Sequence, residues 1–137
     1  MTDLMFTPVS AVLSNMKIRI QRNSVRFRLS KTDVEQLGTI GYLEEETAFG
    51  TSKFYYSVKQ DPSGETLSAE FANGMITMFV PTAFTKDWAA NNVVGIDANV
   101  PFDGQETLYL LVEKDFKCLD NVAEDQSDNY ENPSKTC

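Results

Sequence analysis

Residues 16–29, with the sequence MKIRIQRNSVRFRL, are the stretch that decides the fold. Apolar and charged side chains alternate over residues 17–21 and again over 25–29, on either side of a polar turn at 22–24. Such alternation about a short turn predicts a β-hairpin with one face in the core and one in water. The predicted core face carries Ile18, Ile20, Val25, Phe27 and Leu29, and the other face carries Lys17, Arg19, Arg26 and Arg28.

A short helix is predicted directly after this hairpin. Ser30 can cap its first turn, with Asp33 at the place of the usual capping-box glutamate, and Gly38 is well placed to end it. Asn73-Gly74 between two apolar runs indicates a second hairpin. The remaining signals predict strands at residues 40–49, 53–59, 67–71, 76–80, 93–98 and 106–114, and a second helix at 82–90.

The order of hairpin, short helix and two strands occurs twice along the chain. A shift of 51 residues aligns the core positions of the first half with those of the second. The aligned pairs are Ile18 with Ala69, Ile20 with Phe71, Val25 with Ile76, Phe27 with Met78, Leu29 with Val80, and Leu37 with Trp88. We therefore predict that residues 16–60 and 65–114 are two duplicated ββαββ units, and the alternative is a chance agreement of a common motif.

These elements predict an α+β fold that is mainly β, with about eight strands and two short helices. Closure into a small barrel would remove the exposed edges of the strands. The chain divides into a flexible N-terminal arm at 1–15, a single β-rich domain at 16–119 and an acidic C-terminal tail at 120–137. We expect the part of the tail from about Asp120 to Glu131 to approach the basic hairpin face, with Val122 and Tyr130 as apolar anchors.

Two resemblances to known families follow from particular stretches. Gly74–Pro81, an apolar strand that follows a glycine turn and ends in proline before a short helix, resembles the swapped-hairpin (AbrB-like) barrels over about 45 residues. That class usually has a basic residue where this chain has Met75, so the resemblance implies the fold and not DNA binding. Residues 16–20, 23–29, 112–119 and 124–130, with Asn132-Pro133, resemble a bacterial family of small proteins of unknown function, which implies no activity.

The composition excludes several classes of function. The net charge of −8 disfavours nucleic acid and membrane surfaces as partners. The absence of histidine excludes catalytic triads that use an imidazole, and Cys118 and Cys137 are too few for a zinc site made of cysteines alone. We expect a cytoplasmic protein with no cofactor, in which the two cysteines are free thiols rather than a disulfide.

The basic face formed by Lys17, Arg19, Arg26 and Arg28 is the candidate ligand site. Like charges that face each other across a strand pair are destabilising, so a negative group is expected there. Glu44 and Glu46, or the acidic tail, could supply it from within the chain. The alternative is an anionic ligand, since arginine forks suit phosphate and carboxylate groups.

Two further groups of residues have a chemical and a structural interpretation. Phe54, Tyr55, Tyr56 and Trp88 could line a pocket, but core packing is the simpler interpretation. Carboxylates near the C-terminus could bind Ca²⁺ or Mg²⁺, but their spacing is not that of an EF-hand, and a solvated acidic tail is the simpler interpretation. These carboxylates are Asp115, Asp120, Glu124, Asp125 and Asp128.

The sequence therefore supports one leading hypothesis and one alternative to it. The first is a non-enzymatic binding protein that takes a protein partner or forms a homodimer. The second is a protein or enzyme that holds an anionic, phosphorylated small molecule on the basic hairpin face. A third and weaker hypothesis is a relative of DNA-binding barrels that has lost that activity.

Overall fold

A computed structural model describes residues 14–116 and 127–131 of the chain. Within these residues it contains eight strands, two α-helices and one 3-10 helix. The prediction of an α+β fold that is mainly β is confirmed. The elements are β1 (Lys17–Gln21), β2 (Ser24–Leu29), α2 (Lys31–Thr39), β3 (Tyr42–Ala48), β4 (Lys53–Asp61), β5 (Ser68–Ala72), β6 (Met75–Pro81), α3 (Thr82–Thr85), η2 (Trp88–Ala90), β7 (Gly95–Pro101) and β8 (Thr107–Lys114).

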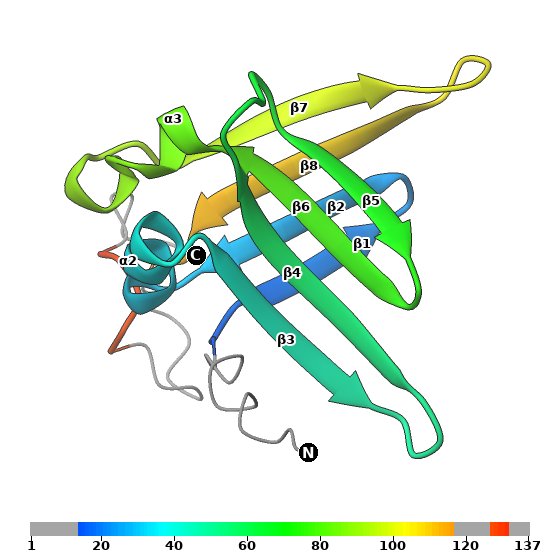
Figure 1. The fold of residues 1–137 in the computed structure, drawn as a ribbon, viewed down its shortest axis with the longest axis horizontal. Helices are drawn as coiled ribbons and strands as arrows, with labels where there is room; N and C mark the ends of the chain where they lie inside the picture. Colours follow the sequence, from blue (N-terminus) through cyan, green and yellow to red (C-terminus); the bar gives the residue numbers. More distant parts are fainter. Residues whose placement is uncertain (1–13, 117–126, 132–137) are drawn as a thin grey trace, which may run out of the picture.

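The strands form two four-stranded sheets (Figure 1). Sheet A has the order β1-β2-β8-β7, and sheet B has the order β3-β4-β6-β5. Each sheet joins two antiparallel hairpins through a central parallel pair, which is β2 with β8 in sheet A and β4 with β6 in sheet B. The inner faces pack on each other, with the rings of Phe27 and Tyr56 in edge-to-face contact at a centroid distance of 5.7 Å.

The predicted barrel, expected to be closed or nearly closed, is not closed, because no strand ladder joins the two packed sheets in the part of the chain that is described. Where the chain enters β1, the backbone N–H and the hydroxyl of Ser14 both donate to the Glu45 carboxylate on β3. Tyr56 of β4 donates its hydroxyl hydrogen to the carbonyl oxygen of Met16, at 3.0 Å. Side-chain hydrogen bonds thus connect the residues before β1 with sheet B.

The two halves of the chain hold equivalent places in the topology. Exchanging β1–β4 with β5–β8 converts the strand order of sheet A into that of sheet B. The burial of aligned residues follows the same exchange: Val25 and Ile76 are each 9% exposed, and Phe27 and Met78 are fully buried. The duplication of residues 16–60 and 65–114 stays a prediction, with which this topology agrees.

Helix α2 begins with the predicted capping box. The Ser30 hydroxyl accepts from the Asp33 N–H, and the Asp33 carboxylate accepts from the Ser30 N–H. The predicted end at Gly38 is wrong, because the helix runs to Thr39 and the left-handed residue is Gly41, with φ 86°. A Cβ atom on Gly38 would lie 3.3 Å from the carbonyl oxygen of Thr85, so this glycine permits close contact with α3 instead.

The second predicted helix is interrupted. Residues 82–90 form α3 and then η2, separated by two residues. The indole N–H of Trp88 donates to the carbonyl oxygen of Val93 at 2.7 Å, and its fully buried ring packs against Phe84 at a centroid distance of 4.9 Å. The buried ring explains why this segment stays compact although it is not one continuous helix.

The helices and the hairpin turns lie at opposite ends of the molecule. Figure 1 shows α2 and α3 together at one end of the sheets, with the turns of all four hairpins toward the other. None of the helices in the described residues is long and apolar enough to cross a membrane. Residues 1–13 of the predicted arm, most of the acidic tail, and both Cys118 and Cys137 lie outside the described residues.

Candidate functional site

The four predicted site residues lie side by side on the outer face of the β1–β2 hairpin. Lys17 stands opposite Arg28 across the strand pair, and Arg19 stands opposite Arg26. Together with Ile18 they line a hollow of about 290 Å³. The structure therefore brings together the residues that the alternation identified, in a site that we call the basic hollow.

Two carboxylates that the sequence analysis did not assign to this face contact the basic hollow. Glu113 accepts from Arg28 Nε at 2.9 Å and from Arg26 Nη2 at 3.5 Å. Asp115 lies 3.0 Å from the Lys17 amine. Glu113 reaches this face because the parallel pairing of β2 with β8 places it opposite Arg28.

The expected counter-ions Glu44 and Glu46 belong to the other sheet, so this alternative is corrected. Both lie on β3, where Glu46 accepts from the Lys53 amine at 3.1 Å and Glu44 accepts from the Tyr42 hydroxyl at 2.5 Å. Burial and the hydrogen bond to Glu44 raise the pKa of Tyr42 to about 12. The pairing of strands far apart in the chain decides which glutamate is the counter-ion of the basic face, and the sequence alone does not reveal that pairing.

Two guanidinium groups of the basic hollow are less completely bonded than the other cations. Arg19 Nη2 contacts the neutral side chain of Gln21 at 3.5 Å. Arg26 Nε is buried and has no hydrogen-bond partner among the described residues. Arg19 and Arg26 therefore retain donor groups that could bind an anion.

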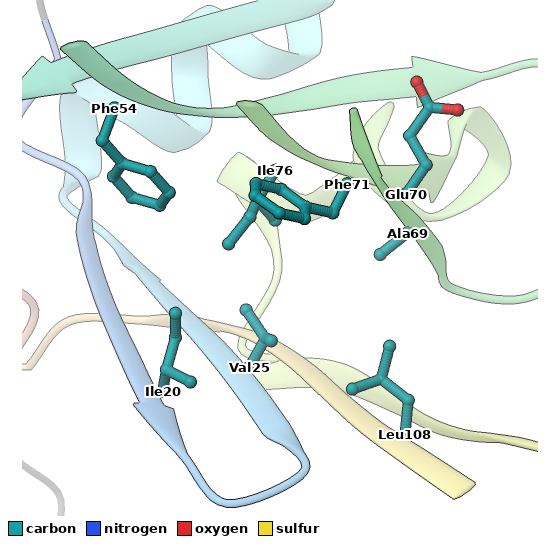
Figure 2. A pocket seen from close by; sticks show the side chains of 8 residues that line it. All are labelled: Ile20, Val25, Phe54, Ala69, Glu70, Phe71, Ile76 and Leu108. Atoms are coloured by element: carbon teal, nitrogen blue, oxygen red, sulfur yellow. The ribbon is translucent and has the colours of Figure 1, made fainter. Parts of the chain in front are cut away.

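A second hollow, which was not predicted, lies between the two sheets at the hairpin-turn end (Figure 2). This apolar cavity has a volume of about 380 Å³. Figure 2 shows apolar side chains of sheet A facing apolar side chains of sheet B, while the Glu70 carboxylate points away from them. The lining residues are Ile20, Val25 and Leu108 from sheet A, and Phe54, Ala69, Glu70, Phe71 and Ile76 from sheet B.

The apolar cavity is open to solvent beside two exposed apolar side chains. Ile20 is 55% exposed and Phe71 is 70% exposed. Each of them stands two residues before the left-handed turn residue of its hairpin, which is Arg22 in the first and Asn73 in the second. Both residues were assigned to a core face and both stand just before a turn. This shared position is the feature of the sequence that could have indicated apolar side chains left partly uncovered at the hairpin-turn end.

The aromatic residues weighed as a pocket do not form one site. Phe54 lines the apolar cavity. Tyr56 packs inside against Phe27, and Trp88 is fully buried beside the helices. Tyr55 faces the opposite side of β4 from Tyr56, because successive strand residues alternate.

Lys114 lies in a buried polar and aromatic setting at the end of β8. Its side-chain amine donates to the carbonyl oxygen of Asn91 at 2.7 Å and stands 4.8 Å from the ring centroid of Tyr130. It also stands 5.8 Å from the centroid of the Trp88 ring, and burial lowers the pKa of Lys114. Asp115, the next residue, is bound to Lys17, so these neighbours do not act as one catalytic pair.

The described part of the tail contacts the first turn of α2. The backbone carbonyl oxygen of Asp128 accepts from the Lys31 N–H at 3.0 Å, and its carboxylate accepts from the Thr32 N–H at 3.3 Å. Tyr130, one predicted anchor, packs edge-to-face on Phe116 at 5.6 Å, and Val122 lies outside the described residues. Asp128 also shares a polar hollow of about 280 Å³ with Lys17 of the basic face.

Two of the five carboxylates proposed for a metal ion, Asp115 and Asp128, belong to the described residues, and both line the polar hollow of about 280 Å³. Asp115 binds Lys17 and Asp128 caps α2, while Asp120, Glu124 and Asp125 lie outside the described residues. Across residues 14–116 and 127–131, no three or more Asp, Glu, Cys or His side chains are grouped closely enough to hold a metal ion.

Comparison with known proteins identifies the family of this chain. A family model described as a family of unknown function (DUF7009) matches residues 16–134. The chain belongs to this family, which confirms the predicted membership of a family of unknown function. No curated protein and no solved structure matches the chain. The AbrB-like resemblance stays a prediction.

Proposed function

We propose that the chain is a non-enzymatic binding protein that holds a small apolar ligand between its two sheets. The observation that supports this proposal is the apolar cavity of about 380 Å³, with walls from both sheets. Small-molecule sites are commonly concave and apolar, with volumes of roughly 300–1,000 Å³. The volume therefore suits a small molecule better than a protein segment.

The lining of the cavity favours an uncharged ligand. Seven of the eight lining residues are apolar, and the carboxylate of the eighth, Glu70, points away from them. A charged group inside would lose water without gaining a partner, which is costly. A ligand at the mouth would also cover apolar surface of Ile20 and Phe71, and burial of such surface contributes about 25 cal/mol per Å².

The lining also favours binding over catalysis. The seven apolar side chains include no acid, base or nucleophile that could act on a bound molecule. A bound ligand would instead be recognised by shape and apolar contact. A protein partner or a second copy of the chain is the rival occupant, because the mouth exposes aromatic surface.

Titration of the full chain with indole, observed through methyl resonances by NMR, tests the proposal. The methyl signals of Val25, Ile76 and Leu108 should shift, and those of Val34 and Leu37 beside the helices should not. A shift spread over the whole core, or no saturable shift, would contradict a defined apolar site.

A matched pair of variants on β5 sharpens this test. Ala69→Leu fills the cavity and should abolish indole binding, whereas Ala72→Leu adds the same side chain at an exposed position outside it and should leave binding unchanged. Equal binding by both variants would refute the proposal. Sedimentation velocity tests the rival occupant. If the protein binds no indole but self-associates, and Ala69→Leu leaves the self-association intact, the hairpin-turn end is the contact surface for a second copy of the chain.

A further inference from the structure

Among the described residues, the basic hollow on the outer face of sheet A has more cations than carboxylates. Four cations line it, and the carboxylates in ion pairs with them among the described residues are Glu113 and Asp115. The cations also stand in two directly opposed pairs across β1 and β2. Opposed like charges on a strand pair are destabilising, so a further anion at this place would be stabilising.

The unused hydrogen-bonding capacity is concentrated in one of these two pairs. In the other pair, Lys17 contacts Asp115 at 3.0 Å and Arg28 contacts Glu113 at 2.9 Å. Arg26 reaches Glu113 only at 3.5 Å, and its Nε atom is buried without a partner among the described residues. Arg19 is hydrogen-bonded at 3.5 Å to a neutral amide.

We infer that Arg19 and Arg26 form a binding site for a tetrahedral oxyanion, either free phosphate or the phosphate group of a small molecule. Two guanidinium groups opposite each other offer paired N–H donors that match the oxygens of a phosphate group. The hollow of about 290 Å³ has room for such a group. This site is separate from the apolar cavity, which lies on the inner face of the same sheet.

Glu113 has a defined part in this inference. It contacts both Arg26 and Arg28, and its shorter contact is to Arg28. An incoming oxyanion replaces Glu113 as the partner of Arg26, while the ion pair between Glu113 and Arg28 remains. Glu113 is then an internal counter-ion that competes with the ligand, so its removal should tighten binding rather than weaken it.

Titration of the full chain with inorganic phosphate, at an ionic strength held constant with sodium chloride, tests the site by calorimetry and by the Nε–H NMR signals of the arginines. We expect saturable binding with shifts of the Arg19 and Arg26 signals. Arg19→Gln should weaken binding roughly tenfold, the size of one lost charge-assisted hydrogen bond. Arg22→Gln removes the same charge from the exposed turn outside the hollow, and should leave binding unchanged.

Further variants and a second ligand make the outcome decisive. Glu113→Gln should bind phosphate more tightly, and weaker or unchanged binding would contradict the competition. Glycerol phosphate distinguishes free phosphate from the phosphate group of a small molecule as the ligand. If it binds more tightly than inorganic phosphate, the site is assigned to a phosphorylated molecule. If it binds more weakly, the site is assigned to the free ion. Equal weakening by Arg19→Gln and Arg22→Gln, or no difference between phosphate and chloride, would overturn the inference.

Discussion

Sheets A and B have similar inner faces and different outer faces. Aligned inner positions share their burial, as Phe27 and Met78 do. On the outer faces, the positions of Arg26 and Arg28 in sheet A align with Thr77 and Phe79 in sheet B. At these aligned positions sheet A forms ion pairs with Glu113, whereas the Thr77 hydroxyl in sheet B accepts a hydrogen bond from the Ser57 hydroxyl at 3.1 Å. The difference teaches that the inner positions specify the shared fold, and the outer positions carry the chemistry in which the sheets differ.

The largest expected effect tests the similarity of the inner faces. Phe27→Ala and Met78→Ala should each lower the free energy of unfolding by about 3–4 kcal/mol, because both side chains are fully buried and leave a cavity. Urea unfolding measures both values. Phe102→Ala, at an exposed position, is the control and should cost far less. A small loss in one of the two core variants would break the equivalence of the sheets.

A smaller effect is expected from the difference between the outer faces. Glu113→Gln should lower stability by about 1 kcal/mol, since it removes partly exposed ion pairs to two arginines, and the loss should shrink in high salt. Lys59 holds the corresponding place in sheet B, because it pairs with Phe79 as Glu113 pairs with Arg28. It forms no ion pair among the described residues. Lys59→Gln should therefore be close to neutral in urea unfolding at either salt concentration. Equal losses of stability in Glu113→Gln and Lys59→Gln would contradict the proposed difference between the outer faces of the two sheets.

The helix-facing ends of the two central strands provide a third comparison. Lys114 pairs with Leu29 in sheet A, and Gln60 pairs with the aligned residue Val80 in sheet B. The Gln60 amide donates to the Thr85 hydroxyl at 2.8 Å. Burial lowers the pKa of Lys114 from 10.5, so at high pH the folded amine loses its proton before the unfolded one does. The wild-type protein should therefore gain stability relative to Lys114→Met as the pH rises through the lowered pKa toward 10.5.

The control for this prediction is Gln60→Met, whose difference from the wild type should not change with pH in the same window. Unfolding by urea at several alkaline pH values measures both differences. A constant difference between the wild type and Lys114→Met would show that the amine keeps its ordinary pKa.

The smallest effect concerns the turns of the β1–β2 and β5–β6 hairpins, which are the first hairpins of the two halves of the chain. Arg22 and Asn73 are both left-handed, with φ 50° and 53°. Asparagine tolerates this conformation better than arginine does, so Arg22→Asn should raise stability by about 0.5–1 kcal/mol. Asn73→Arg should lower it by a similar amount. Thermal unfolding measures both changes, and two shifts of the same sign would show that the turns are not equivalent.

Local features of the fold could be predicted from the sequence, because they depend on neighbouring residues. The first hairpin, the capping box of Ser30 and Asp33, and the basic face all follow from alternation and turn chemistry. The counter-ion could not be predicted, because Glu113 reaches Arg28 only through a parallel pair between strands far apart in the chain. Glu44 and Glu46 were the wrong choice for the same reason.

The apolar cavity was missed for a different reason. Alternation assigns Ile20 to the inner face correctly, but it does not report how far the two sheets separate at their turn end. The hydrogen bonds from Ser14 and Tyr56, which connect the residues before β1 with sheet B, also involve particular side chains that a pattern of hydrophobicity does not register.

The strand order also determines when each sheet can form during synthesis. Sheet B uses one continuous stretch, from Tyr42 to Pro81, whereas sheet A pairs the first hairpin with the last. A nascent chain can therefore complete sheet B before β8 has been synthesised. Until then, the edge of β2 that pairs with β8 stays open, and the apolar face of the first hairpin stays uncovered. Pairing across so long a separation is slow, and open edges favour intermolecular contacts. The interval before Thr107–Lys114 leaves the ribosome is thus the period in which this chain depends most on dilution or on chaperones.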